Sequence, residues 1–151
     1  MMNELYNQRI LRLAAEIPLI GRLENAAAKA DAQSRLCGSK VHVELSLAED
    51  NMGNLVVAAF AHEVEACALG QASSSVMARE IIGADPAELR QVGAEMRAML
   101  KRDGPPPQDS ARGARWSDLE VLEPVREYKN RHASTLLTFD AVEDCLSQLG
   151  L

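Results

Sequence analysis

A chain of 151 residues, 47% hydrophobic and 25% charged, has the size and composition of a single globular domain with a substantial core. Its formal net charge of −6 argues against nucleic acid or an anionic membrane as the main partner, because both attract basic surfaces. The N-terminal segment lacks the apolar run and cleavage site of a secretory signal, and no apolar stretch approaches the roughly 20 residues that a membrane span needs. We therefore expect a cytoplasmic protein.

The first half of the chain is expected to form one helix followed by a β-hairpin. Apolar residues of helical period cover 3–17, where Pro18 ends the helix, and 21–35 is expected to be a loop or a short helical piece. Strict alternation of apolar and polar residues over 40–48 predicts a half-buried strand. A turn separates it from a second β-rich stretch, 55–66, which forms either one strand or two strands divided by a bulge.

The second half of the chain is expected to be helical. A serine-rich segment at Ser73 is expected to begin one helix, and Asp85 followed by Pro86 is typical of the start of another. The proline-rich stretch 103–115 is expected to be a loop. The expected helical segments are 73–82, 85–100, 116–126 and 134–149. The order helix, sheet, helices predicts one compact α+β domain over residues 1–151.

Three cysteines, Cys37, Cys67 and Cys145, carry the chemistry that the sequence suggests. An odd number of cysteines in a reducing compartment does not indicate a disulfide framework, and no CxxC pair is present. Cys37 precedes the first expected strand and Cys67 follows the last, so pairing of these strands about 4.8 Å apart would bring the two thiols together. A helix N-terminus after Cys67 would favour its thiolate. The alternative is that both are small apolar residues of the core, as is expected for Cys145.

Four segments of the chain resemble, in the right order, the motifs of one protein family. They are Leu5-Tyr6-Asn7, Cys37-Gly38-Ser39, the run from Cys67 to Ser75 and the run from Tyr128 to Phe139. On these segments the chain is identified as a member of the NifU/IscU/SufU family of iron–sulfur cluster assembly scaffolds, with the SufU branch closest. The resemblance implies a three-stranded, mainly antiparallel sheet with helices packed on one face, as in SufE- and NifU-like proteins.

Two of the four metal ligands that the family uses are replaced in this chain. The family's ligands are a cysteine and an aspartate in the first cysteine motif and one cysteine in each of the other two. Cys37 and Cys67 match, whereas Ser39 replaces the aspartate and Ser134 replaces the third cysteine. Because a hydroxyl is a poorer ligand than a thiolate or a carboxylate, His132 is the expected substitute. The predicted metal ligands are Cys37, Cys67 and His132, and the alternative for His132 is a surface or capping role.

The resemblance implies a scaffold or sulfur acceptor that takes persulfide sulfur from a cysteine desulfurase, with Cys67 or Cys37 as the attacking thiolate. Sulfur or a nascent cluster would then pass to later assembly proteins or target proteins. The cofactor would be a transient [2Fe–2S] cluster or iron, with zinc as an alternative, or the two serines would leave the site without metal. As an enzyme, such a protein is at most a sulfurtransferase-type carrier. Two other interpretations stay open: a degenerate module that binds or regulates a partner, and a structural zinc domain.

Overall fold

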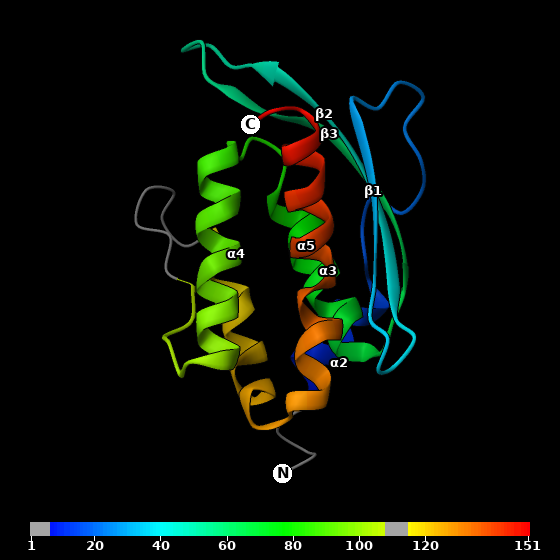
Figure 1. The fold of residues 1–151 in the computed structure, drawn as a ribbon, viewed down its shortest axis with the longest axis vertical. Coiled ribbons are helices and arrows are strands. Elements are labelled where there is room, and N and C mark those ends of the chain that lie inside the picture. The colour runs from blue at the N-terminus through cyan, green and yellow to red at the C-terminus, as the bar shows by residue number, and fades with distance from the viewer. Residues whose placement is uncertain (1–6, 108–114) are drawn as a thin grey trace.

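The computed structural model describes residues 7–107 and 115–151, and its elements form a sheet with helices on one side (Figure 1). The strands are β1 (Ala28–Gln33), β2 (Lys40–Glu49) and β3 (Leu55–Glu65), and the α-helices are α2 (Gln8–Ala15), α3 (Ala68–Glu80), α4 (Pro86–Lys101) and α5 (His132–Gln148). Two 3-10 helices, η1 (Ser117–Glu127) and η2 (Lys129–Arg131), precede α5. The predicted α+β fold with a three-stranded antiparallel sheet is confirmed.

The β2–β3 hairpin is built as the alternation of residues predicts. Alternate side chains of β2 are buried under the helices: Val41, Val43 and Leu45. Lys40 at the start of β2 pairs with Glu65 at the end of β3, so the outer ends of the two strands lie side by side. A register shift midway along β2 marks a bulge, but β3 continues through it as one strand.

The third strand of the sheet is β1, at one edge. A loop or short helical piece over 21–35 is a wrong prediction, because Ala28–Gln33 forms a strand that pairs antiparallel with β2. Its alanines alternate with polar residues, and Ala28 and Ala30 are buried against the helices. Alanine is depleted in strands, so composition hides this pattern. Pairing with β2 and packing of these small side chains against α5 decide the conformation.

Helix α3 begins earlier than the serine-rich segment suggests. Cys67 is the N-cap residue, with an extended backbone, and the helix starts at Ala68. The predicted start at Ser73 is therefore wrong. Ser73, Ser74 and Ser75 lie inside the helix and are completely or almost completely buried. Their small side chains let α3 pack closely on its neighbours, of which α5 is one.

The caps of α2 and α4 follow the sequence. The Asn7 side chain accepts a hydrogen bond from the N–H of Ile10 at 3.0 Å, which sets the start of α2. The Leu5-Tyr6 part of the first family motif lies outside the described residues. Asp85 accepts from the N–H of Glu88 at 2.8 Å, and this confirms the predicted start of α4.

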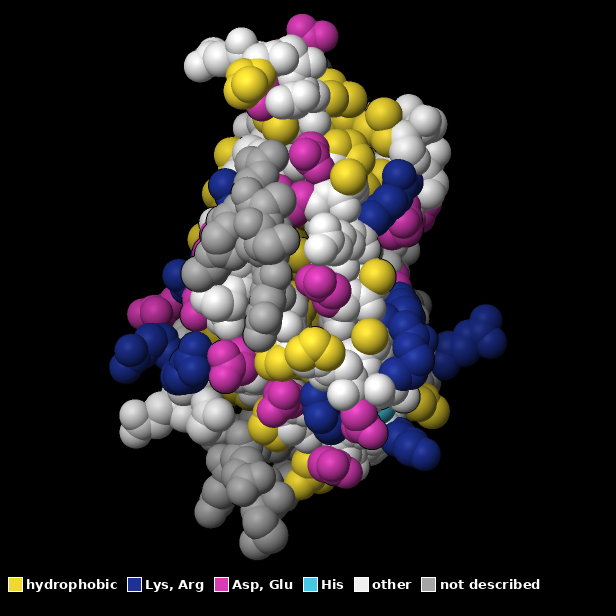
Figure 2. Space-filling model, turned by 90° about the vertical axis from the view of Figure 1, so that its left-hand side faces the viewer, with side chains coloured by type: hydrophobic (Ala, Val, Ile, Leu, Met, Phe, Trp, Pro, Cys, Tyr) yellow, Lys and Arg dark blue, Asp and Glu magenta, His cyan; other side chains and the backbone are white. Residues whose placement is uncertain are grey.

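The core lies between the sheet and α3 and α5, and α4 lies on the other side of α5 (Figure 1). Trp116, before η1, is fully buried and donates its indole N–H to Glu88 of α4 at 2.8 Å. Figure 2 shows acidic and basic side chains interspersed over the face that is turned toward the viewer. Within residues 7–107 and 115–151, none of the helices combines the length and apolarity that crossing a membrane requires.

Candidate functional site

Cys37 lies in the tight β1–β2 turn, at the end of the sheet where β3 also ends. Gly38 has a φ of +71°, and the N–H of Ser34 donates to the carbonyl of Ser39 at 2.8 Å to close the turn. The Cys37 thiol is exposed and donates to the hydroxyl of Ser39 at 3.1 Å and to that of Ser34 at 3.5 Å. The turn therefore presents a reactive group to solvent while fixing it to neighbouring hydroxyls.

Cys67 lies beside the same turn, at the N-terminus of α3. Its half-buried sulfur is 3.3 Å from the hydroxyl of Ser134, in the first turn of α5. Ser134 in turn donates to the hydroxyl of Ser39 at 3.2 Å. Cys37, Ser39, Ser134 and Cys67 thus form one continuous chain of hydrogen bonds, which we call the thiol–hydroxyl row. The two cysteines that the strand order predicts to be neighbours are thus connected through the hydroxyls of Ser39 and Ser134.

Gly70 allows the α3 and α5 segments of the row to meet. A Cβ at this position would lie 2.8 Å from the Ser134 hydroxyl oxygen and 3.1 Å from the Ser134 carbonyl oxygen. Next along α3, Ser73 donates to the carbonyl of Thr135 at 2.7 Å and fixes the two helices together. The Cβ of Ala66 would lie 2.8 Å away as well, so position 70 accepts only glycine unless α5 or Ala66 moves. In the sequence, only the position of Gly70 three residues after Cys67 points to this role. The sequence does not show that Ser134 of α5 is the residue it contacts.

The surroundings of both cysteines of the row favour thiolate. The pKa of Cys37 is lowered from 9.0 to about 7, first by the Ser39 hydroxyl and then by that of Ser34. Burial opposes ionisation of Cys67, but Ser134, the N–H groups of Gly70 and Leu69, and the charge of Arg131 together lower its pKa.

The third cysteine, Cys145, lies apart from this chemistry. It is fully buried within α5, and burial raises the pKa of its thiol to about 12. A thiol of this kind is neither a nucleophile nor a ligand at neutral pH. This environment agrees with the expectation that Cys145 is an inert, packed side chain.

His132 is at the start of α5, and its ring points to η1. Its buried Nε2 lies 3.1 Å from the carbonyl oxygen of Val125 and 3.2 Å from that of Arg126, so Nε2–H caps the end of η1. In the part of the chain that the structure describes, no three His, Cys, Asp or Glu side chains are grouped to hold a metal ion. The role of His132 as a metal ligand stays a prediction.

The donor set of the row does not match a four-ligand site for zinc or iron. Such sites use thiolate, imidazole or carboxylate donors, whereas the row offers two thiols and two hydroxyls. The hydroxyls are also committed to each other and to the sulfurs by hydrogen bonds. The arrangement supplies two thiols with lowered pKa values, and the hydroxyl groups between them can stabilise a thiolate.

Comparison with known proteins identifies the class of protein to which this fold and cysteine arrangement belong. Residues 5–135 match the family model of the NifU-like N terminal domain. The chain belongs to this family. A search of the curated proteins finds no match.

Solved structures share the fold over almost the whole chain. The N-terminal part of a nitrogen-fixing NifU-like protein from Brucella abortus is 52% identical, with a TM-score of 0.89, covering 99% of this chain and 96% of that one. A putative iron–sulfur cluster assembly scaffold protein for the SUF system from Fervidobacterium islandicum AW-1 is 22% identical, with a TM-score of 0.77, covering 97% and 99%. A hypothetical protein is 19% identical, with a TM-score of 0.77, covering 96% and 98%. The last two show a common fold.

Proposed function

We propose that this protein acts in iron–sulfur cluster assembly as a scaffold-family sulfur acceptor. It takes persulfide sulfur from a cysteine desulfurase and passes it to later assembly or target proteins. The observation that carries this proposal is the thiol–hydroxyl row, which holds two thiols with lowered pKa values. Membership of the NifU-like family supports the pathway, and the structural similarity to the putative cluster assembly scaffold from Fervidobacterium agrees with it.

Cys37 is the first acceptor in this proposal, because it is exposed and its pKa is about 7. Its thiolate attacks the outer sulfur of the desulfurase persulfide. A new S–S bond forms on Cys37, the S–S bond on the enzyme breaks, and the desulfurase cysteine leaves as a thiolate. No electrons are gained or lost overall. The hydroxyls of Ser39 and Ser34, which accept from the neutral thiol, reorient to donate to the anionic sulfur.

Cys67 is the second, more protected thiol of the proposed site. It is half-buried between the N-termini of α3 and α5, with the positive charge of Arg131 nearby. This setting stabilises an anionic sulfur and limits the access of solvent to it. Iron or a nascent cluster is cargo in this scheme. The two thiolates would supply half of the four cysteine ligands that such a cluster takes, and the recipient would supply the rest.

The test is anaerobic incubation of the protein with a cysteine desulfurase and cysteine, followed by intact-mass spectrometry. We expect a mass increase of one sulfur atom, with an acceptance rate that rises through about pH 7, the pKa of Cys37. Cys37→Ser should abolish the increase, whereas Cys145→Ser, which changes the buried thiol, should retain it. Equal sulfur loading of wild type and Cys37→Ser would refute Cys37 as the acceptor.

A partner-binding module is the second candidate function, favoured by the replacement of two family ligands with Ser39 and Ser134. The variant with both Cys37→Ser and Cys67→Ser separates the two functions. If the protein is a sulfur acceptor, this variant no longer takes sulfur from the desulfurase. If it is a partner-binding module, the variant still binds its partner and still regulates it. Elemental analysis of the same purified proteins tests the structural zinc interpretation, which requires stoichiometric zinc in the wild type and unfolding without it.

A further inference from the structure

A groove of about 270 Å³ separates α4 from α5 and contains none of the thiol–hydroxyl row. Its apolar lining comes from α3, α4 and α5: Met77, Leu89, Phe139, Val142 and Leu146. These side chains are buried in the core beneath the groove. The volume is close to the lower end of the range for small-molecule sites, and the combination of an apolar lining with a few charged groups is typical of them.

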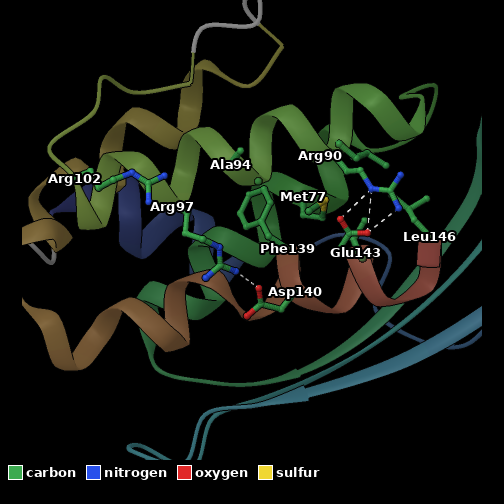
Figure 3. A pocket seen from close by; sticks show the side chains of 12 residues that line it. Met77, Arg90, Ala94, Arg97, Arg102, Phe139, Asp140, Glu143 and Leu146 are labelled. Atoms are coloured by element: carbon green, nitrogen blue, oxygen red, sulfur yellow. Dashed lines mark hydrogen bonds and ion pairs between the residues drawn. The ribbon is translucent and has the colours of Figure 1, made fainter. Parts of the chain in front are cut away.

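Two ion pairs cross from α4 to α5 and close the groove at its ends (Figure 3). Arg90 forms a two-pronged contact with Glu143, with nitrogen–oxygen distances of 2.9 Å, and Arg97 pairs with Asp140. Arg97 comes seven positions after Arg90, which is a distance of roughly 10 Å along α4. The pairs hold the two helices together over a stretch where apolar side chains do not fill the space between them.

Gly93 leaves this space open. It lies inside α4, between the two ion pairs, where glycine weakens a helix relative to alanine. A Cβ there would meet only Phe139, at 3.9 Å, which is ordinary van der Waals contact. Packing therefore does not require glycine at this position. The consequence of glycine is that position 93 itself places no side chain in the groove beside Phe139.

One end of the groove carries a surplus of positive charge. Figure 3 shows the side chains of Arg97 and Arg102 at the same end, where Asp140 is the paired carboxylate. Lys101 is close enough to act on Asp140 as well. Arg102 is exposed, and among the described carboxylates none lies within ion-pair distance of it. An anionic group at this end would find a guanidinium that no described carboxylate pairs with.

We propose that the α4–α5 groove binds a small carboxylate with an apolar body, the carboxylate on Arg102 and the apolar body over Phe139 beside Gly93. The charge at one end and the apolar lining along the rest match the two parts of such a ligand. This site does not depend on the proposed sulfur transfer, because it shares no residue with the thiol–hydroxyl row.

Isothermal titration calorimetry of the full chain with hexanoate, and separately with 1-hexanol, tests the proposal. We expect saturable binding of hexanoate at one site and at least about tenfold weaker binding of the alcohol. Gly93→Leu, which places a side chain in the groove, and Arg102→Gln, which removes the exposed charge, should each weaken hexanoate binding by about tenfold or more. The matched controls are Gln91→Leu on the exposed face of α4 and Arg12→Gln on α2, and both should bind as the wild type does.

Three outcomes would overturn the proposal. The first is the absence of saturable hexanoate binding by the wild type up to about 10 mM. The second is equal affinity for hexanoate and hexanol, which would leave no role for Arg102. The third is unchanged hexanoate binding by folded Gly93→Leu. Should Gly93→Leu fail to fold by circular dichroism, Arg102→Gln decides the matter, since it changes only an exposed side chain.

Discussion

Ser39 and Ser134 are predicted to occupy two of the four ligand positions of the family, and the structure brings both of them to the two cysteines. Both side chains are buried, and their hydroxyl oxygens are 3.2 Å apart. Replacing them together, Ser39→Asp with Ser134→Cys, would convert the row into three thiols and a carboxylate, which is a donor set that zinc accepts. We expect this double variant to purify with close to one zinc per chain, measured by elemental mass spectrometry, and the wild type to carry much less.

A control with the same change in composition separates geometry from the mere addition of ligands. Ser117→Asp with Ser147→Cys places the same two side chains at exposed serines away from the row, and should leave the metal content at the wild-type level. If the Ser39→Asp, Ser134→Cys variant folds but carries no more zinc than this control, the four positions do not converge closely enough to bind one ion.

The candidate site is partly visible in the sequence. The strand order alone places Cys37 and Cys67 at neighbouring strand ends, and the register of β2 and β3 agrees. The hydroxyl bridge between the cysteines could not be predicted, because it depends on where α5 begins relative to α3. The contacts of the His132 ring could not be predicted either, because they depend on where η1 places the carbonyl groups of Val125 and Arg126. The periodicity of the sequence does not indicate the course of η1.

Contact between helices α3 and α5 depends on Gly70. In Gly70→Ala the new methyl group would lie 2.8 Å from the Ser134 hydroxyl oxygen, so α5 must move or the hydrogen bond between Ser134 and Cys67 must break. We expect a loss of about 1–3 kcal/mol in the free energy of unfolding, the usual cost of overpacking a core. The pKa of Cys67 should also rise, because the Ser134 hydrogen bond is one of the contacts that lower it. Urea unfolding and the pH dependence of Cys67 alkylation measure the two effects.

Gly93→Ala is the matched control at the same scale. Position 93 is also a glycine inside a helix, but the nearest contact of an added Cβ is 3.9 Å. Alanine there should stabilise the protein by about 0.5–1 kcal/mol, since it favours the helix without a clash. If Gly70→Ala is as stable as Gly93→Ala, the close approach of α3 and α5 at Ser134 does not constrain position 70.

Helices and strands with a clear hydrophobic periodicity can be predicted from the sequence, whereas those built from residues with a weak propensity for their conformation cannot. The β2–β3 hairpin and the helices α4 and α5 follow from alternation, helical period and the Asp85 cap. The sequence does not predict strand β1, because its inward residues are alanines, whose conformation is decided by pairing with β2. It predicts too late a start for α3, because serines favour caps in isolation, whereas here they lie inside the helix at a close helix contact.

At the scale of the whole molecule, one ionic cluster ties the strands to the segment that leads into β1. His42 of β2 has both ring nitrogens on carboxylates, with Nδ1 2.9 Å from Asp31 of β1 and Nε2 2.7 Å from Glu44. Glu44 is fully buried and also accepts from the N–H of Leu23 at 2.9 Å, while Arg22 lies 3.5 Å from it. Because both ring nitrogens must donate, the cluster is fully bonded when His42 is an imidazolium.

The two titrating partners of this cluster affect stability in opposite pH ranges. The pKa of His42 is raised, chiefly by its hydrogen bond to Glu44, with Asp31 adding to the effect and burial and Arg22 opposing it. Its contribution is therefore complete below about pH 6.5, the value for an unfolded chain, and is lost as pH rises through the higher folded value. Burial would raise the pKa of Glu44, but His42 and Leu23 outweigh it and lower this pKa. The contribution of Glu44 is present above about pH 4.3 and is lost as pH falls through the lower folded value.

His42→Gln isolates the histidine part of this dependence. Other groups also titrate in this range: His62, whose pKa burial lowers, and Cys37, with a lowered pKa of about 7, both add stability as pH rises. The informative quantity is thus the difference in free energy of unfolding between wild type and His42→Gln, measured by urea unfolding at each pH. We expect the wild type to be more stable at about pH 6, and this advantage to shrink steadily toward about pH 9 as the imidazolium deprotonates. A difference that stays constant over this range would mean that His42 holds the cluster by packing or by neutral hydrogen bonds, and that its charge does not join β1, β2 and the Arg22–Leu23 segment.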